Sequence, residues 1–356
     1  MTPGWRKVRR ELVRISQQLQ TIPEAIWEPV AQRRHDASFD TFPVYPGEIS
    51  PSPRMAIYLI WQPNGLPASV LETCRHLRAK GYAVLVVSNA PLSDGDRSKL
   101  LPDVWAVLER PNYGYDFGGY RDGLRYFRKR SIEPQRLVIL NDSVWYPLRP
   151  DDTLLEDAEA ADADVVGTVP RHRGEERFLE SYFYSIRGTV LTHPAFEQFW
   201  QQYRLTSNKY KVIRLGERGF SKAMRAAGLS VRGLYTEAAF ADAIADADTA
   251  LLRRILAYAA FVDPEPRQQA EQLSRTGSEI EMRAFILESI ISFQFYSTYP
   301  VAAAGLLRHP VLKKSREPVS AAWREAFLRA VGDEVLPPPL PTVLSEAQIR
   351  IAEGTR

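Results

Sequence analysis

Three polar residues follow a short apolar run, and their side chains could hold a charged ligand. The run LVIL at residues 137–140 has the composition of a buried strand, and Asn141, Asp142 and Ser143 come directly after it. A carboxylate at a strand end can coordinate a divalent ion such as Mg²⁺ or Mn²⁺, or accept hydrogen bonds from a sugar. A single aspartate supplies few ligands for a metal ion, so a turn or capping role for Asp142 is the alternative interpretation.

A glycine-rich segment, NYGYDFGGY at residues 112–120, lies between a predicted strand and a predicted helix. Its glycines, Gly114 first among them, would let backbone N–H groups approach a phosphate or a sugar, and a helix N-terminus favours an anion. The carboxylate of Asp116 could instead bind sugar hydroxyls. A tight turn with Asp116 as the helix N-cap explains the same pattern without a ligand.

A third segment, LGERGFS at residues 215–221, begins a predicted helix that ends at Gly228. The carboxylate of Glu217 could act as a general base. The helix dipole also favours a carboxylate at a helix start, so a purely structural role for Glu217 remains open. The five histidines form no metal-ligand pattern, and no Walker loop or nucleophile elbow is present in the sequence.

The elements that would position these side chains alternate between strands and helices. Continuous apolar strands covered by helices are typical of a parallel sheet. Ligands bind such sheets beyond the carboxyl ends of the strands, which is where Asn89 and the segment 141–143 fall. The pattern predicts an α/β fold with strands at 55–61, 83–88, 104–109 and 137–140 and helices at 67–80 and 120–130.

Three regions are expected along the chain. Residues 1–53 combine a basic amphipathic helix with the beginning of a proline-rich linker, FPVYPGEISPSPR, at residues 42–54. Residues 54–240 form the α/β domain, and residues 241–356 form a helical C-terminal region.

The predicted N-terminal helix has one apolar stripe beside several arginines and a lysine. A basic helix of this kind can lie on an anionic membrane surface. Docking of the same stripe on the protein's own domain is the alternative. The stripe consists of Trp5, Val8, Leu12, Ile15 and Leu19.

The composition narrows the class of protein. The 356 residues carry a net charge of +3, which is too balanced for a dedicated nucleic-acid binder. The single cysteine, Cys74, can form neither an intramolecular disulfide nor a structural zinc site. No apolar run approaches the ~20 residues that span a bilayer, and no secretory signal is recognisable. We expect a cytoplasmic protein without a nucleic-acid partner, whose basic helix allows peripheral contact with the cytoplasmic face of the inner membrane.

In their order, these segments resemble the rhamnan synthesis protein F family of cell-surface polysaccharide glycosyltransferases. The resemblance spans residues 55–315, with the most specific motifs between 112 and 228. The matching pieces are NYGYDFGGY, LVILNDSVWYPL, ESYFYSI (180–186), FEQFW…KYKVIRLGERGFSKAMRAAG (196–228) and, more weakly, YPVAAAGLLRHPVLKKS (299–315).

The same order is similar to the GT-A glycosyltransferase plan, a Rossmann-like sheet flanked by helices. In that plan a strand-terminal acidic motif holds the donor diphosphate, and a later Glu-Asp pair supplies the general base. Here the strand-terminal motif keeps one carboxylate, Asp142, and Arg218 follows Glu217 where the second acid would stand. The single carboxylate leaves open whether the reaction depends on a metal ion, and Arg218 in place of the second acid leaves open which residue is the base.

The resemblance implies roles for individual residues. Asp142 and Glu217 would be catalytic, with Glu217 as base if the reaction inverts the anomeric centre. Arg218 or Lys211 would neutralise the diphosphate without metal, and Arg218 would keep the pKa of Glu217 low. Any Mg²⁺ or Mn²⁺ would be held by Asp142. The donor would contact Asn89, Asn112, Gly114, Asp116, Asn141, Asp142 and Ser143, and the acceptor Glu180, Ser181 and Tyr182.

The function that the resemblance implies is transfer of a deoxyhexose from a nucleotide-activated donor to a lipid-linked polysaccharide or O-antigen acceptor. Rhamnose, carried as dTDP-rhamnose, is the expected sugar. Two alternatives remain: a transferase of fucose, mannose or galactose, and a non-catalytic GT-A-like scaffold in polysaccharide assembly.

Overall fold

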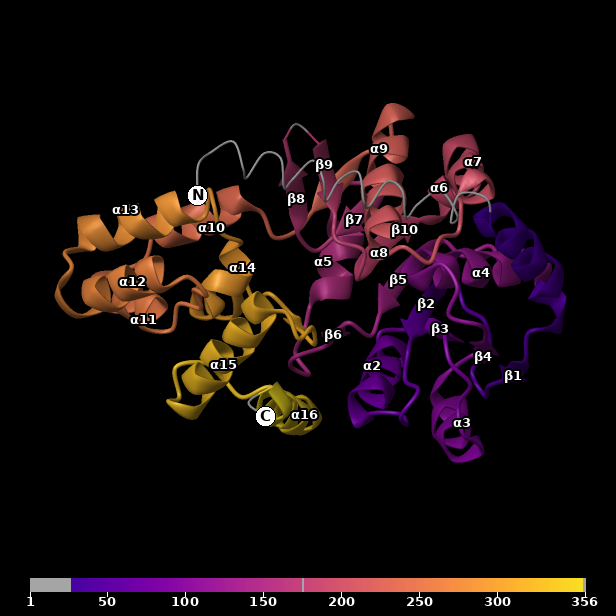
Figure 1. Cartoon of the computed structure of the whole chain (residues 1–356), viewed down its shortest axis with the longest axis horizontal. Helices are drawn as coiled ribbons and strands as arrows, with labels where there is room; N and C mark the ends of the chain where they lie inside the picture. Colours follow the sequence, from indigo (N-terminus) through magenta and orange to yellow (C-terminus); the bar gives the residue numbers. More distant parts are fainter. Residues whose placement is uncertain (1–26, 175, 355–356) are drawn as a thin grey trace.

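The computed structural model describes residues 27–174 and 176–354. Its centre is an eight-stranded sheet, with most of the helices of its C-terminal region gathered at one end of the molecule (Figure 1). The strand order is β1 (Val44–Pro46), β4 (Ala106–Glu109), β3 (Ala83–Ser88), β2 (Arg54–Ile60), β5 (Arg136–Asn141), β10 (Phe183–Arg187), β7 (Val165–Gly167) and β11 (Val231–Gly233). The predicted α/β fold with a mostly parallel sheet flanked by helices is confirmed.

The four strands β4, β3, β2 and β5 run parallel, and β10 pairs antiparallel with both β5 and β7. Their apolar residues alternate between two cores, one on each face of the sheet. In β2, for example, Ile57 belongs to one core and Tyr58 to the other. This two-sided burial is the physical reason for the continuous apolar runs in the sequence.

Helices cover both faces of the sheet. The core on one face includes residues of α4 (Tyr115–Lys129), α7 (Pro194–Gln202) and α9 (Gly219–Ala226). The core on the other face includes residues of α2 (Ala68–Ala79), α5 (Leu154–Ala160) and the C-terminal helices. The shorter elements nearby are α3 (Asp94–Leu100), α6 (Gly188–Leu191), α8 (Lys209–Val212), the hairpin of β8 (Pro170–Arg173) and β9 (Glu176–Leu179), and the 3₁₀ turns Phe39–Thr41 and Leu101–Asp103.

The C-terminal region is helical, as predicted, and shares its core with the sheet. A short strand, β12 (Leu312–Lys313), returns to the sheet domain and pairs antiparallel with β6 (Val144–Trp145). Two lysines at residues 313 and 314 are thereby brought next to the strand end at residues 141–143. The helices are α10 (Glu237–Ala245), α11 (Thr249–Ala257), α12 (Pro264–Thr276), α13 (Glu279–Ser289), α14 (Phe295–Thr298), α15 (Pro318–Gly332) and α16 (Pro341–Gly354), with a π-helical turn at Ala302–Leu306.

The N-terminal expectations meet the structure only in part. The amphipathic helix predicted between Trp5 and Leu19 lies outside the described residues. Residues 27–38 are helical, an element that the sequence did not predict. Part of the expected linker at residues 42–54 is instead the edge strand β1, in which Tyr45 pairs with Val107 of β4. The prolines at such an edge are tolerated because one side of the strand makes no ladder hydrogen bonds.

Candidate functional site

The ends of four parallel strands bring several polar residues together at the carboxyl edge of the sheet. Trp61 follows β2, Asn89 follows β3, Arg110 follows β4, and Asn141 ends β5. Ser143 is exposed there, whereas Asn89, Arg110 and Asn141 are buried. This is the edge at which an α/β sheet of this kind binds ligands.

Asn141 connects the two predicted motifs. Its amide nitrogen donates to Asp116 Oδ2 over 3.1 Å and to the hydroxyl of Tyr120 over 2.9 Å. Its amide oxygen accepts from the backbone N–H of Ser143 at 3.1 Å and from the Ser143 hydroxyl at 2.5 Å. Both the nitrogen and the oxygen of the Asn141 amide are therefore hydrogen-bonded, and the side chain links α4 to the end of β5.

Asp142 fixes the segment that follows β2. Its Oδ2 accepts hydrogen bonds from the backbone N–H of Trp61 at 2.8 Å and from the side chain of Gln62 at 2.6 Å. Burial raises the pKa of Asp142, and the positive charge of Lys314 opposes that rise. Asp142 thus has a structural task at the strand end in addition to any contact with a ligand.

Asp116 lies in the first turn of α4, two residues after the N-cap Gly114. Burial, together with the charges of Asp142 and Glu217, raises its pKa to about 7. Three carboxylates that the sequence analysis took from separate motifs therefore interact electrostatically at one place. A carboxyl group with a pKa near neutrality can exchange a proton under ordinary conditions.

Two glycines of this motif allow close packing of the backbone. Gly114 has a positive φ of 82°, and a side chain there would lie 2.7 Å from Leu205. A Cβ atom on Gly119 would lie 2.2 Å from Leu59 of β2. Because α4 begins at Tyr115 and not at residue 120, Gly119 is inside the helix, where its lack of a side chain lets α4 approach the sheet.

Glu217 lies in a π-helical turn, Ile213–Arg218, immediately before α9. Such turns are frequent at functional sites. Its Oε1 accepts from the backbone N–H of Ser181 at 3.1 Å and from the Ser181 hydroxyl at 2.5 Å. Burial raises the pKa of Glu217, and these two hydrogen bonds oppose the rise.

The expected effect of Arg218 on Glu217 is wrong. Arg218 forms an ion pair with Glu176 of β9, with its Nε 2.7 Å from Oε2, and the pKa of Glu217 is raised rather than lowered. Lys211 on α8 lies 3.6 Å from the carboxylate of Glu28, in the helix at residues 27–38. Each of the two predicted diphosphate-binding cations thus has a carboxylate partner within the protein.

The three acceptor-side candidates are buried. Glu180 lies 3.0 Å from Arg171 and 3.1 Å from Lys313, and it accepts a hydrogen bond from Tyr296 at 2.7 Å. Burial would raise the pKa of Glu180, but these positive charges outweigh it and leave the pKa below its ordinary value. The Tyr182 hydroxyl accepts from Thr168 at 2.6 Å.

Two cations that the sequence analysis did not assign to the site are Lys313 and Lys314. Lys314 donates to the Ser69 hydroxyl at 3.2 Å and lies 5.5 Å above the Trp145 ring. Burial lowers the pKa of Lys314, while the charges of Asp142 and Glu346 act in the opposite direction. The two lysines lie near the end of the segment 299–315, one of the segments that carry the family resemblance, so the sequence contained a sign that they belong to the site.

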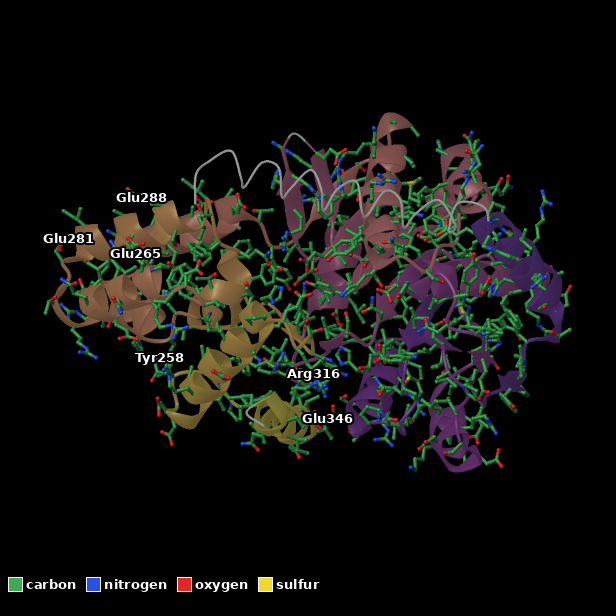
Figure 2. The ribbon with its side chains drawn as sticks, in the orientation of Figure 1. Tyr258, Glu265, Glu281, Glu288, Arg316 and Glu346 are labelled. Atoms are coloured by element: carbon green, nitrogen blue, oxygen red, sulfur yellow. The ribbon has the colours of Figure 1, made fainter. Side chains whose placement is uncertain are left out.

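Glu346 of α16 ties the C-terminal end of the chain to this edge of the sheet. Figure 2 labels it at α16, beside α2. Its carboxylate accepts from the Ser69 hydroxyl at 2.6 Å and from the Trp145 indole at 2.8 Å. The C-terminal region thus supplies part of the surroundings of Lys314.

Asn89 and Asn112 belong to a second, buried polar network. Asn89 donates to Asn112 over 3.1 Å and accepts from Arg110 at 2.5 Å. Arg110 pairs with Asp122 at 2.6 Å, and Asp122 contacts His35 at 2.7 Å. This network links the site to the helix at residues 27–38. No spacing in the sequence indicated it, because its members come from four separate segments.

Among residues 27–174 and 176–354, no three histidine, cysteine, aspartate or glutamate side chains are grouped as metal ligands. These side chains therefore do not fit a protein-built metal cage. Coordination of Mg²⁺ or Mn²⁺ by Asp142 stays a prediction.

Fold and site together define an α/β protein with interacting carboxylates and buried lysines at the carboxyl edge of its sheet. The family model described as rhamnan synthesis protein F matches residues 84–253. The chain is also 31% identical over 334 residues to uncharacterized protein y4gN of Sinorhizobium fredii (strain NBRC 101917 / NGR234), a match that covers 90% of this chain and 86% of that protein. The chain belongs to the rhamnan synthesis protein F family.

Membership gives the protein a glycosyltransferase-like role in polysaccharide synthesis, with a sugar donor and a glycan acceptor in general terms. In the part of the chain that the structure describes, no helix combines the length and the apolar character needed to cross a bilayer.

Proposed function

We propose that the protein is a GT-A-type glycosyltransferase that moves rhamnose from dTDP-rhamnose to a lipid-linked glycan at the cytoplasmic face of the inner membrane. The observation that carries this proposal is the gathering of three carboxylates at the carboxyl edge of the sheet. Asp142 follows β5, and Asp116 accepts a hydrogen bond from Asn141 at the end of the same strand. Asn141 also bonds to Tyr120, whose hydroxyl donates to the carbonyl of Ser181, and Ser181 donates to Glu217. Carboxylates at this edge suit both the hydroxyl groups of a sugar and the proton of an attacking hydroxyl.

Transfer requires three things of the site. The acceptor hydroxyl must lose its proton as its oxygen bonds to the anomeric carbon, the diphosphate must leave with its charge stabilised, and water must be excluded. Glu217 is the proposed base: its Oε1 is oriented by Ser181, and its raised pKa makes it a stronger base than an exposed glutamate. In the inverting reaction the base and the leaving diphosphate lie on opposite sides of the sugar.

The leaving diphosphate needs a cation. Lys314 lies beside Asp142 and Lys313 beside Glu180, so both positive charges are at this edge, whereas Arg218 and Lys211 are paired elsewhere. We assign the diphosphate-stabilising role to Lys314, because burial strengthens the interaction of its ammonium group with an anion.

The test is release of nucleoside diphosphate from purified full-length protein. dTDP-rhamnose is compared with GDP-fucose, GDP-mannose and UDP-galactose, without an acceptor, because an active transferase leaks some sugar to water. The proposal expects fastest release from dTDP-rhamnose and loss of release in the Glu217→Gln variant. Fastest release from another donor would reassign the sugar, and no release from any of them would favour the non-catalytic scaffold.

A further inference from the structure

An open groove lies between the helix at residues 27–38 and the helices α7, α8 and α9, and its lining includes neither Lys313 nor Lys314. Its volume is about 1180 Å³. Its walls include the apolar side chains of Phe199, Leu205 and Ala226 and the guanidinium groups of Arg33, Arg204 and Arg214. Apolar surface and positive charge are therefore combined in one concave surface.

The three arginines are exposed, and no hydrogen bond or ion pair of their side chains occurs within residues 27–174 and 176–354. The acidic side chains of the groove are already engaged. Asp36 forms ion pairs with Arg121 and Arg125 of α4. Three unneutralised guanidinium groups consequently face solvent in the groove, and they favour an anionic occupant.

A second carboxylate of the groove, Glu28, accepts a hydrogen bond from the Thr206 hydroxyl and lies 3.6 Å from Lys211. It therefore does not neutralise the three arginines. Two exposed aromatic residues adjoin the groove in the chain: Trp27, 63% exposed, precedes Glu28, and Tyr210, 84% exposed, precedes Lys211. Tryptophan and tyrosine rings of this kind prefer the boundary between water and lipid.

We propose that this groove binds the phosphate groups of anionic phospholipids and docks the protein on a bilayer surface, with Trp27 and Tyr210 in the headgroup layer. The inference goes beyond the proposed membrane location, because it assigns the contact to described residues outside the predicted N-terminal helix. It does not depend on sugar transfer. Arginine forms paired hydrogen bonds with phosphate, which suits three free guanidinium groups better than a neutral ligand does.

The protein's own N-terminus is the competing occupant. Residues 1–26 contain five basic side chains and only two glutamates. A segment with this positive excess is repelled by an arginine-lined groove, and both surfaces together attract the same anionic membrane. Charge complementarity therefore favours the lipid phosphate.

The experiment measures binding of the full-length protein to phosphatidylglycerol vesicles and to phosphatidylcholine vesicles. The groove variant is Arg33→Ala/Arg204→Ala/Arg214→Ala. Its matched control, Arg130→Ala/Arg254→Ala/Arg275→Ala, removes the same charge at exposed arginines away from the groove. At low salt the groove variant should lose at least about tenfold in affinity for phosphatidylglycerol vesicles, and the control should lose less than about threefold.

Unchanged binding of the groove variant, or equal losses in the two triple variants, would overturn the proposal. Wild-type binding of phosphatidylcholine as tight as that of phosphatidylglycerol would overturn it too. The variant Arg33→Lys/Arg204→Lys/Arg214→Lys should recover most of the affinity. Nucleoside diphosphate release from a soluble donor should be unchanged in the groove variant, so a failed docking site and a failed transferase assignment give different results.

Discussion

Asn141 at the end of β5 donates a hydrogen bond to Asp116 in the first turn of α4, over 3.1 Å between Nδ2 and Oδ2. The contact joins two segments that lie 25 residues apart in the sequence. It orients a carboxyl group whose pKa is raised to about 7 by burial and by the charges of Asp142 and Glu217. Asp116 is thereby poised to change its charge near neutral pH.

This relationship predicts a pH dependence of stability. A raised pKa in the folded state means that folding favours the protonated carboxyl group. The contribution of Asp116 to the free energy of unfolding is therefore complete below its ordinary pKa of 3.8 and is lost as the pH rises through about 7. In Asp116→Asn, the decline in unfolding free energy between pH 4 and pH 8 should be smaller than in the wild type, as measured by urea unfolding.

The control for this measurement is Asp246→Asn, which changes an exposed aspartate at the end of α10. It should leave the pH dependence as it is in the wild type. If the unfolding free energies of Asp116→Asn and of the wild type decline equally between pH 4 and pH 8, the raised pKa of Asp116 is contradicted.

A second prediction separates the two tasks of Asp142. Asp142→Ala removes the acceptor of the Trp61 N–H and the Gln62 amide, so it should cost about 1–3 kcal/mol of unfolding free energy and abolish donor hydrolysis. Asp142→Asn keeps an oxygen that can accept from Trp61, and it should cost less stability. Thermal unfolding and donor hydrolysis of both variants are the measurements.

If Asp142→Asn is more stable than Asp142→Ala but equally inactive in donor hydrolysis, the negative charge of Asp142 is required for the reaction. Recovery of hydrolysis together with stability would instead show that Asp142 acts only by positioning the segment after β2.

A third prediction concerns the base. Glu217→Gln should lower the rate of single-turnover transfer by ~10²–10⁴, the usual worth of a positioned general base, and leave donor binding intact. In Ser181→Ala, loss of the serine hydroxyl removes a hydrogen bond that opposes the rise in the Glu217 pKa. The pH–rate profile of Ser181→Ala should therefore shift its acidic limb to higher pH. A lower melting temperature with a normal rate in Glu217→Gln would show a structural role only.

The sequence was sufficient for the fold class and for the order of the central elements, because each buried strand is a continuous apolar run between turn signals. The strand Ala83–Ser88 was predicted to the residue. The edge strand β1 was missed because its residues are proline-rich and only half-buried, so they carry neither an apolar run nor a regular alternation.

The site was predictable only one segment at a time. Asp116, Asp142 and Glu217 stood out in separate motifs, but the interaction between their charges depends on how α4 and the π-helical turn pack beside β5. The ion pair of Arg218 with Glu176 was not predictable, since it joins two elements 42 residues apart. Lys314 reaches the site through the β12–β6 pairing, which is a long-range contact without a local signal.

Packing of α4 on the sheet gives a fourth prediction. The Cβ atom added by Gly119→Ala would lie 2.2 Å from Leu59, so α4 or β2 must shift, at a cost of about 1–3 kcal/mol in unfolding free energy. Gly332→Ala at the end of α15 is the control, because no atom lies within 4 Å of its added Cβ. Urea unfolding should show Gly119→Ala destabilised and Gly332→Ala neutral or slightly stabilised. Equal midpoints for the two variants would contradict the close approach.

The last prediction concerns the pair of Lys313 and Glu180, which joins the C-terminal region to the segment between β9 and β10 over 3.1 Å. Lys313→Met leaves the buried Glu180 carboxylate with Arg171 and the Tyr296 hydroxyl, and it should cost about 1–3 kcal/mol. Glu180→Gln leaves the Lys313 ammonium without its carboxylate and should cost a similar amount. Each single substitution leaves the charge of the other residue without its partner. The double variant should therefore lose less unfolding free energy than the sum of the two single losses, with a coupling energy of about 0.5–3 kcal/mol.

An exposed ion pair that also involves the C-terminal region serves as the control for the Lys313 and Glu180 variants. Arg308 lies 3.0 Å from Asp151, and both side chains are about half exposed or more. Water screens that pair, so Arg308→Met should change the unfolding free energy by less than about 0.5 kcal/mol. Urea unfolding measures the unfolding free energy of each single variant and of the double variant. Additive losses at Lys313 and Glu180 would mean that their contact does not couple the C-terminal region to the sheet domain.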